Sequence, residues 1–155
     1  MANANIRILS DYAALMDSIA GKGKAFETMA HAAVFSAGLA FSKKGIIKKN
    51  FKIKPVPENR EIRDVVLDKF HEQIDMLSMA HTGSHEILKN QDDLKVERYK
   101  ILELYANEGL AILEKIKGKN PTDLNGIDSV IQELSSISAE INKKDENLDI
   151  EEPDF

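Results

Sequence analysis

The chain has 155 residues, of which 43% are hydrophobic and 30% are charged, and its net charge is −5. This length suits one domain, and this balance is typical of a globular chain rather than a disordered one. The absence of cysteine excludes disulfides, thiolate metal sites and thiol nucleophiles. Because the N-terminus lacks a secretory signal and the longest apolar stretch, residues 29–41, is too short to span a bilayer, we expect a soluble cytoplasmic protein with no membrane contact.

The first part of the chain shows helical spacing of its apolar residues. A first helix is predicted to begin after Ser10, whose hydroxyl can cap free backbone N–H groups, although residues 6–9 extend the pattern backwards. A second helix is predicted over residues 25–42, with Lys43 and Lys44 suited to its negative end. Because this helix is rich in alanine and apolar on most sides, we expect it to lie centrally, with neighbours on more than one side.

The pattern changes after residue 45. Residues 51–54 alternate apolar and basic side chains, which predicts a short extended or β segment near residues 46–54. One such strand is not stable alone, so we expect half of a small hairpin or an edge that pairs with a partner. Helical spacing returns over residues 59–82.

The C-terminal half is predicted to be helical. Ser84 can cap a short helix that ends at Leu88, and the longest helix is predicted over residues 94–117. Gly109 lies inside that helix, where glycine costs about 1 kcal/mol relative to alanine, so we expect close packing there. A last helix is predicted over residues 124–143.

Together these patterns predict a mostly α fold class: a compact helical domain of five to six helices, with one short extended or β segment near residues 46–54. The single domain is expected to cover residues 1–143. Residues 144–155 carry six acidic side chains against one lysine and have little apolar content. We therefore expect an acidic, disordered tail.

No arrangement of side chains in the sequence is typical of a catalytic centre. His81 and His85 are four residues apart, but Gly83 between them disfavours a regular helix, and a zinc site needs at least a third ligand. The sequence has no Gly-x-Ser-x-Gly nucleophile motif and no complete phosphate-binding loop. We therefore predict a protein that is not an enzyme and that has no catalytic residues, no metal and no cofactor.

A basic segment is the strongest candidate for a binding site. Residues 43–63 hold eight basic side chains against two acidic ones. Lysines that neutralise phosphates give salt-sensitive, sequence-independent affinity for nucleic acid. The alternative is a solvated loop or edge strand, in which lysines prevent unwanted pairing. The candidate nucleic-acid-binding residues are Lys43, Lys44, Lys48, Lys49, Lys52, Lys54, Arg60 and Arg63.

Two stretches resemble the motifs of a known family. Residues 26–41 resemble a Phe-x-Thr-Met … Phe-x-x-Ala-x-x-Leu-Gly pattern, and residues 101–113 resemble Ile-Leu-Glu-x-Tyr-Ala-Asn-x-Gly-Leu-x-Ile-Leu. In this order they resemble the DNA phosphorothioation-associated protein 4 family, small accessory proteins of bacterial DNA phosphorothioation (Dnd) gene clusters. The motif positions are Phe26, Thr28, Met29, Tyr105, Ala106, Asn107, Gly109 and Leu110.

The resemblance implies a non-enzymatic accessory or interaction protein of a bacterial DNA phosphorothioate modification or restriction system with a role in antiviral defence. Such systems replace a backbone phosphate oxygen with sulfur, and some restrict unmodified DNA. The implied partners are other proteins of the same system, with DNA as a second candidate. No catalytic residue is carried over. Asn107 and Gly109 are expected to serve helix packing, and a bond from Asn107 to a partner is the alternative.

Two other interpretations stay open at this point. In the first interpretation, the chain is a structural helical adaptor or homodimer that is joined through its apolar helices and is unrelated to DNA. In the other it is a small hydrolase or nuclease of unrecognised type.

Overall fold

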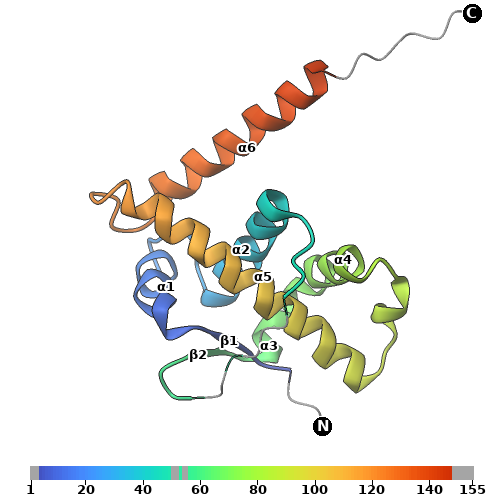
Figure 1. The fold of residues 1–155 in the computed structure, drawn as a ribbon. Coiled ribbons are helices and arrows are strands. Elements are labelled where there is room, and N and C mark those ends of the chain that lie inside the picture. Colours follow the sequence, from blue (N-terminus) through green and yellow to red (C-terminus); the bar gives the residue numbers. More distant parts are fainter. Residues whose placement is uncertain (1–3, 50–52, 54–55, 148–155) are drawn as a thin grey trace, which may run out of the picture.

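Helix α5 (Asp92–Gly118) is the axis around which the fold is built (Figure 1). Its apolar side chains recur every three or four residues, which buries one broad face from Tyr99 to Leu113. The computed structural model describes residues 4–49, 53 and 56–147. The other elements in these ranges are β1 (Ile6–Ile8), the 3-10 turn η1 (Ser10–Tyr12), α1 (Ala13–Ile19), α2 (Met29–Lys44), β2 (Arg60–Ile62), α3 (Asp64–Leu67), η2 (Asp68–Phe70), α4 (His71–Thr82), η3 (His85–Leu88) and α6 (Ile127–Asn147).

Helix α2 packs closely along α5 because its contacting side chains are small. Gly109 of α5 lies directly against the backbone of Ser36 in α2, where a side chain would have no room. The predicted close packing at Gly109 is therefore confirmed, and so is the mostly α fold class. Most of the buried positions of α2 are alanines, namely Ala30, Ala32, Ala33, Ala37 and Ala40.

The strands pair two segments that are far apart in the sequence. Strand β1 is antiparallel to β2, and Ile6 lies opposite Ile62 while Ile8 lies opposite Arg60. Ile6 and Ile8 are fully buried in the core, and Arg7 between them is half-buried. The backward extension of the first helix over residues 6–9 is therefore wrong, because these residues find a strand partner and alternate between two faces.

Residues 46–62 also differ from the prediction. Of the predicted extended segment near residues 46–54, the structure describes 46–49 and 53, and these form no strand; the second strand is β2 instead. The helix predicted over residues 59–82 is broken: its start is β2, and α3, η2 and α4 follow. Asn59 is buried and accepts a hydrogen bond from the backbone N–H of Ser10 at 2.9 Å, which holds the start of β2 against the N-terminal segment.

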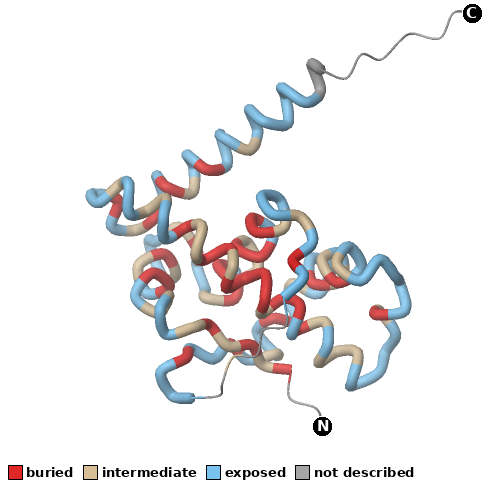
Figure 2. The backbone as a smooth tube through the Cα atoms, in the orientation of Figure 1, coloured by how far each residue is buried: buried red, intermediate tan, exposed pale blue. Residues whose placement is uncertain are grey.

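Helix α6 projects from the body of the protein, and most of its surface is exposed (Figures 1 and 2). It is held at its N-terminal end, where the buried carboxylate of Asp123 accepts bonds from the N–H and the hydroxyl of Ser129 at 2.8 and 2.6 Å. The helix runs to Asn147, which is past the boundary at residue 144 predicted between domain and tail. The rest of the predicted tail, residues 148–155, lies outside the described residues.

Candidate interaction surfaces

The basic residues of the predicted nucleic-acid site are mostly engaged with acidic side chains of the same protein. Glu108 of α5 lies 2.7 Å from the ammonium of Lys44 and 3.0 Å from that of Lys49. The hydrogen bond from Lys44, assisted by the one from Lys49, lowers the pKa of Glu108 despite its partial burial. Glu108 is therefore an anion at neutral pH, and it holds the segment after α2 against α5.

Two further basic residues of this set are also paired. Lys43 at the end of α2 lies 2.8 Å from Glu133 and 3.6 Å from Glu140 of α6, and the hydrogen bond to Glu133 is the main reason that its pKa is raised. Arg60 lies 2.6 Å from Asp17 of α1. These pairs join neighbouring elements, so their first role is in the fold.

The remaining four candidates fall into two groups. Lys48 and Arg63 are exposed, and neither makes an ion pair within the described part of the chain. Lys52 and Lys54 lie outside the described residues. The structure therefore does not gather the predicted residues into one free basic patch: of the six that it describes, Lys48 and Arg63 alone are without an acidic partner there.

The first family motif organises the start of α2. The hydroxyl of Thr28 accepts a hydrogen bond from the N–H of His31 at 3.1 Å and so caps the helix. Phe26 is buried, and its ring lies 5.0 Å from that of Phe35. Met29 is half-buried and packs against the core. This cap explains why α2 begins at Met29 and not at residue 25.

Asn107, in the second motif, replaces a neighbouring strand along the free edge of β1. Its side-chain Nδ2 donates to the carbonyl oxygens of Arg7 and Glu103 at 2.9 and 2.8 Å, and its Oδ1 accepts from the N–H of Leu9 at 2.9 Å. One turn earlier, the carboxylate of Glu103 accepts from the N–H of Arg7 at 2.8 Å. Helix α5 therefore satisfies the edge of β1 that β2 does not, and the side chain of Asn107 makes these bonds within the chain itself.

Tyr105 ties three segments together beneath the surface. Its side chain is fully buried, and its hydroxyl oxygen accepts a bond from the N–H of Ile47 at 3.0 Å. The same hydroxyl lies 2.8 Å from Nδ1 of His81 at the end of α4. Ala106 and Leu110 are fully buried beside it. The motif positions thus hold the N-terminal strand, the segment after α2 and the end of α4 on α5.

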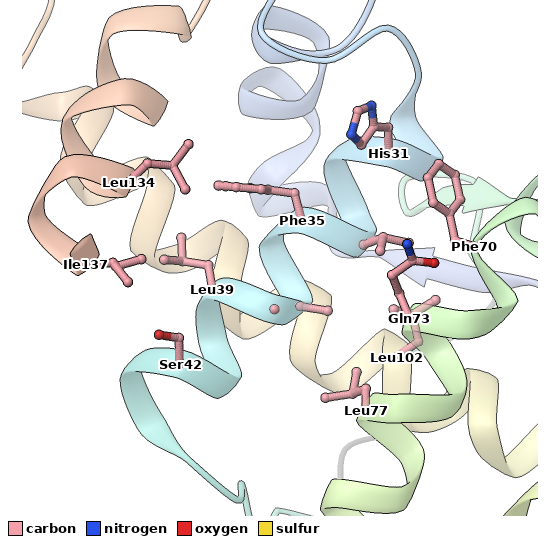
Figure 3. Close-up of a pocket in the computed structure, with 13 residues that line it drawn as sticks. His31, Phe35, Leu39, Ser42, Phe70, Gln73, Leu77, Leu102, Leu134 and Ile137 are labelled. Carbon is pink, nitrogen blue, oxygen red and sulfur yellow. The ribbon is translucent and has the colours of Figure 1, made fainter. Parts of the chain in front are cut away.

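An open apolar groove lies between α2, α4 and α6 (Figure 3). Its volume is about 460 Å³. Helix α2 forms its floor, while Phe70 and α4 form one wall and α6 the other. Among the described residues, no lysine, arginine, aspartate or glutamate lines it. The lining residues are His31, Val34, Phe35, Ala37, Gly38, Leu39, Ser42, Phe70, Gln73, Leu77, Leu102, Leu134 and Ile137.

The groove explains why the second helix is apolar on most sides. One face of α2 packs on α5, and the opposite face, which includes Phe35 and Gly38, is left at the groove. The sequence indicated neighbours on more than one side, but it did not reveal a groove, because the lining residues lie far apart in the chain, from His31 to Ile137. Apolar groups exposed in a concave surface are typical of a binding site.

The wall formed by α6 continues beyond the body of the protein. Ile131, Leu134 and Ile141 lie on this helix with 57%, 47% and 53% of their surface exposed. Their spacing of three and seven residues places them on one side of the helix. This apolar stripe, residues 131, 134 and 141, therefore extends the groove along α6.

Two other features, a metal-binding cluster and a membrane-spanning helix, are absent from the described ranges. Within residues 4–49, 53 and 56–147, no group of three or more histidine and acidic side chains lies close enough together to hold a metal ion. None of the helices in these ranges combines the length and the apolar character that crossing a bilayer requires.

Comparison with known proteins identifies one family. The model of DNA sulphur modification system-associated protein 4 matches residues 5–152. The match extends beyond residues 26–116, over which the two motifs lie, and includes β1, α1 and α6. No curated protein and no solved structure matches the chain.

Proposed function

The chain belongs to the DNA sulphur modification system-associated protein 4 family, and on this premise we propose that it is a non-enzymatic accessory protein that binds another protein of the same system. We propose that its groove between α2, α4 and α6 receives an amphipathic helix of that partner. The observation that carries the proposal is the uncharged lining of the groove in a surface that is otherwise rich in charge. In this role the protein serves DNA modification or the antiviral defence built on it.

The dimensions of the groove favour a helix as the bound element. The floor extends from His31 to Ser42 of α2, which at 1.5 Å per residue is about 16 Å, or three helical turns. A helix with apolar residues at positions i, i+3, i+4 and i+7 would cover that length. Gly38 lies near the middle of the floor, and, outside its chain neighbours and the backbone of its own helix, no atom lies within 4 Å of the place where a Cβ would be. A partner helix therefore has space to approach closely there.

The apolar stripe of α6 supplies further contact area. Fully burying an exposed leucine or isoleucine side chain contributes roughly 1.5–3 kcal/mol, and the three residues of the stripe are about half exposed, so each offers roughly half of that. The three residues of the stripe, together with the groove, offer enough apolar surface for a helix that lies beside α6. Lys43, through its pairs with Glu133 and Glu140, holds α6 at the position that opens the groove.

The test is to fill the groove without disturbing the core. We expect Gly38→Arg to abolish binding to the partner, because an arginine in the middle of the floor occupies the space of the incoming helix. Gly118→Arg is the matched control, since Gly118 is also a helical glycine with open space around it but lies outside the groove. Each purified protein of the DNA sulphur modification system is tested for binding to both variants and to the natural chain by calorimetry.

Three outcomes separate the proposal from its alternatives. Binding of one system protein that Gly38→Arg removes and Gly118→Arg keeps supports it. Self-association of the natural chain in sedimentation, lost in Gly38→Arg and without a system partner, identifies a homodimer instead. DNA cleavage by the purified chain, retained in both variants, would point to the unrecognised nuclease and contradict a purely non-enzymatic role.

A further inference from the structure

A small polar pocket lies where the segment after α2 meets the end of α4. Its volume is about 390 Å³, and it is lined by Ile46, Ile47, Lys48, Lys49 and His81. We infer that this pocket binds a phosphate group of a DNA backbone, held by the two ammonium groups and by Nε2 of His81. The inference does not depend on the groove, because the described residues that line the pocket and the groove are different ones.

Tyr105 fixes the orientation of the His81 imidazole. The hydroxyl oxygen of Tyr105 already accepts the N–H of Ile47, and Tyr105 is fully buried. Within the described ranges its one remaining partner is Nδ1 of His81, at 2.8 Å. A buried hydroxyl proton needs an acceptor, so the Tyr105 proton is donated to Nδ1. His81 therefore carries its own proton on Nε2, which is a free donor on the side of the ring away from Tyr105.

The ammonium groups of Lys48 and Lys49 give the pocket positive charge. Lys48 is exposed and forms no ion pair with any described residue. Lys49 shares the carboxylate of Glu108 with Lys44, and 62% of its side chain is still exposed. A phosphate oxyanion is thus offered one free ammonium, one shared ammonium and one imidazole N–H. Charge-assisted bonds of this kind are the strong ones in phosphate recognition.

The described groups that line the pocket suit a phosphate rather than a base. Apart from the three cationic or donor side chains, the described residues that line it are two isoleucines, and none of these described residues offers an aromatic ring or a side-chain amide to stack on a base or read its edge. Such a site recognises phosphate without sequence information, which is the usual character of contacts to a nucleic-acid backbone. DNA is the source of phosphate that the family's association with a DNA modification system supplies; free inorganic phosphate has the same chemistry.

The experiment follows the imidazole of His81 by NMR in the full-length, nitrogen-15-labelled chain. We expect the free protein to show the Nε2–H tautomer for His81, and a short DNA duplex to shift the His81 signals. An equal concentration of phosphate groups as inorganic phosphate should leave them unchanged. His85, which is highly exposed and lies outside the pocket, serves as the internal reference.

Variants then test the two lysines and the acid that competes for them. Lys48→Glu should weaken duplex binding about tenfold, and the matched Lys119→Glu, which makes the same charge change on an exposed lysine outside the pocket, should weaken it much less. Glu108→Gln should tighten binding about threefold, because it frees the ammonium groups of Lys44 and Lys49. Glu108→Gln is expected to change the affinity for DNA in the opposite direction to Lys48→Glu, so a general loss of structure cannot produce its effect.

Each result decides the inference. Shifts at His81 with duplex DNA, weakened by Lys48→Glu and strengthened by Glu108→Gln, support it. A response to inorganic phosphate alone overturns the assignment to DNA. A response to neither ligand, or equal weakening by Lys48→Glu and Lys119→Glu, overturns the pocket as a phosphate site.

Discussion

Gly109 of α5 and Ser36 of α2 meet backbone to backbone. A Cβ on Gly109 would lie 1.7 Å from the carbonyl oxygen of Ser36 and 2.4 Å from its carbonyl carbon. Ser36 is fully buried, and its hydroxyl donates to the carbonyl of Ala32 at 2.7 Å, so its polar group is satisfied within α2. The two longest helices of the core therefore pack as closely as their backbones allow.

Gly109→Ala is expected to be strongly destabilising. Alanine favours a helix over glycine by about 1 kcal/mol, but its methyl group would displace α2, and overpacking a core costs roughly 1–3 kcal/mol or more. We expect a net loss of at least about 2 kcal/mol in the free energy of unfolding, measured by urea denaturation. Gly38→Ala is the control: it has open space and helical geometry, so it should stabilise the protein by up to about 1 kcal/mol. A Gly109→Ala variant as stable as the natural chain would contradict the packing described.

Asn107→Leu is expected to release β1 from α5. The leucine has a similar size but leaves the carbonyl of Arg7 and the N–H of Leu9 without their partners, at about 1–3 kcal/mol for each unsatisfied group. We expect a loss of roughly 2–4 kcal/mol and a faster amide hydrogen exchange at Leu9. Asn120→Leu, at a half-buried asparagine near α6, should cost less than about 1 kcal/mol. Unchanged protection of Leu9 in Asn107→Leu would refute the role of this side chain.

The stability of the protein is expected to depend on the ionisation of Asp123. Burial on its own would raise the pKa of Asp123, but hydrogen bonds from Ser129 and from nearby backbone N–H groups outweigh it, and the pKa lies below its usual value of 3.8. A lowered pKa in the folded state means that the carboxylate stabilises the fold at neutral pH, and that this contribution is lost as the pH falls through the folded pKa.

Asp123→Asn measures this contribution. We expect the variant to be less stable than the natural chain by roughly 1–2 kcal/mol at pH 7. The difference should hold down to about pH 5 and shrink below about pH 4. Urea denaturation of both proteins between pH 3 and pH 7 gives the two curves. A difference that grows on acidification would show that the sign is wrong.

Lys43 is expected to matter more for α6 than its position in the basic segment suggests. Glu133 is buried, so Lys43→Met leaves a carboxylate with little water and without its nearest cation. We expect a loss of about 1–3 kcal/mol in the free energy of unfolding. The double variant Lys43→Met with Glu133→Gln should recover most of it, because no buried charge is then left unpaired and Glu140, which also loses Lys43, is exposed to water.

Lys49→Met is the variant with which the loss of stability in Lys43→Met is compared. Its pair with Glu108 is largely exposed on the lysine side, and pairs of this kind contribute less than about 1 kcal/mol. If Lys43→Met lowered the free energy of unfolding as little as Lys49→Met does, the contact with Glu133 would not stabilise the fold. Lys43 would then be a cation that is open to a ligand.

The helices with regular apolar spacing were predictable, and the strands were not. The long helix and the cap at Ser84 depend on residues within a few turns of one another. A glycine inside the long helix indicated close packing at Gly109, but it did not indicate that the neighbour is Ser36 of α2. Ile6 and Ile8 have a pattern that suits a short helix or a strand equally. Only the bonds that Glu103, Asn107 and β2 make to this segment decide between them, and these partners lie between 52 and 100 residues away along the chain.

The candidate sites were harder to predict for the same reason. The basic segment was visible in the sequence, but its pairing was not, because Glu108 is 64 residues from Lys44 and Asp17 is 43 residues from Arg60. The groove draws on four helices and the pocket on two distant segments, so neither has a local motif. In the sequence, His81 stands out only through its spacing of four residues from His85, whereas its partner in the structure is Tyr105.

The sequence alone determined the helical class, the exclusion of cysteine chemistry and the resemblance to the family, since these depend on composition, on local periodicity and on short motifs. The tertiary structure decided what each charge faces, where the apolar surface stays open and what the motif residues do. The physical reason is that a hydrogen bond, an ion pair or a groove exists only when groups far apart in the chain are brought within a few ångströms, and no local pattern encodes that distance.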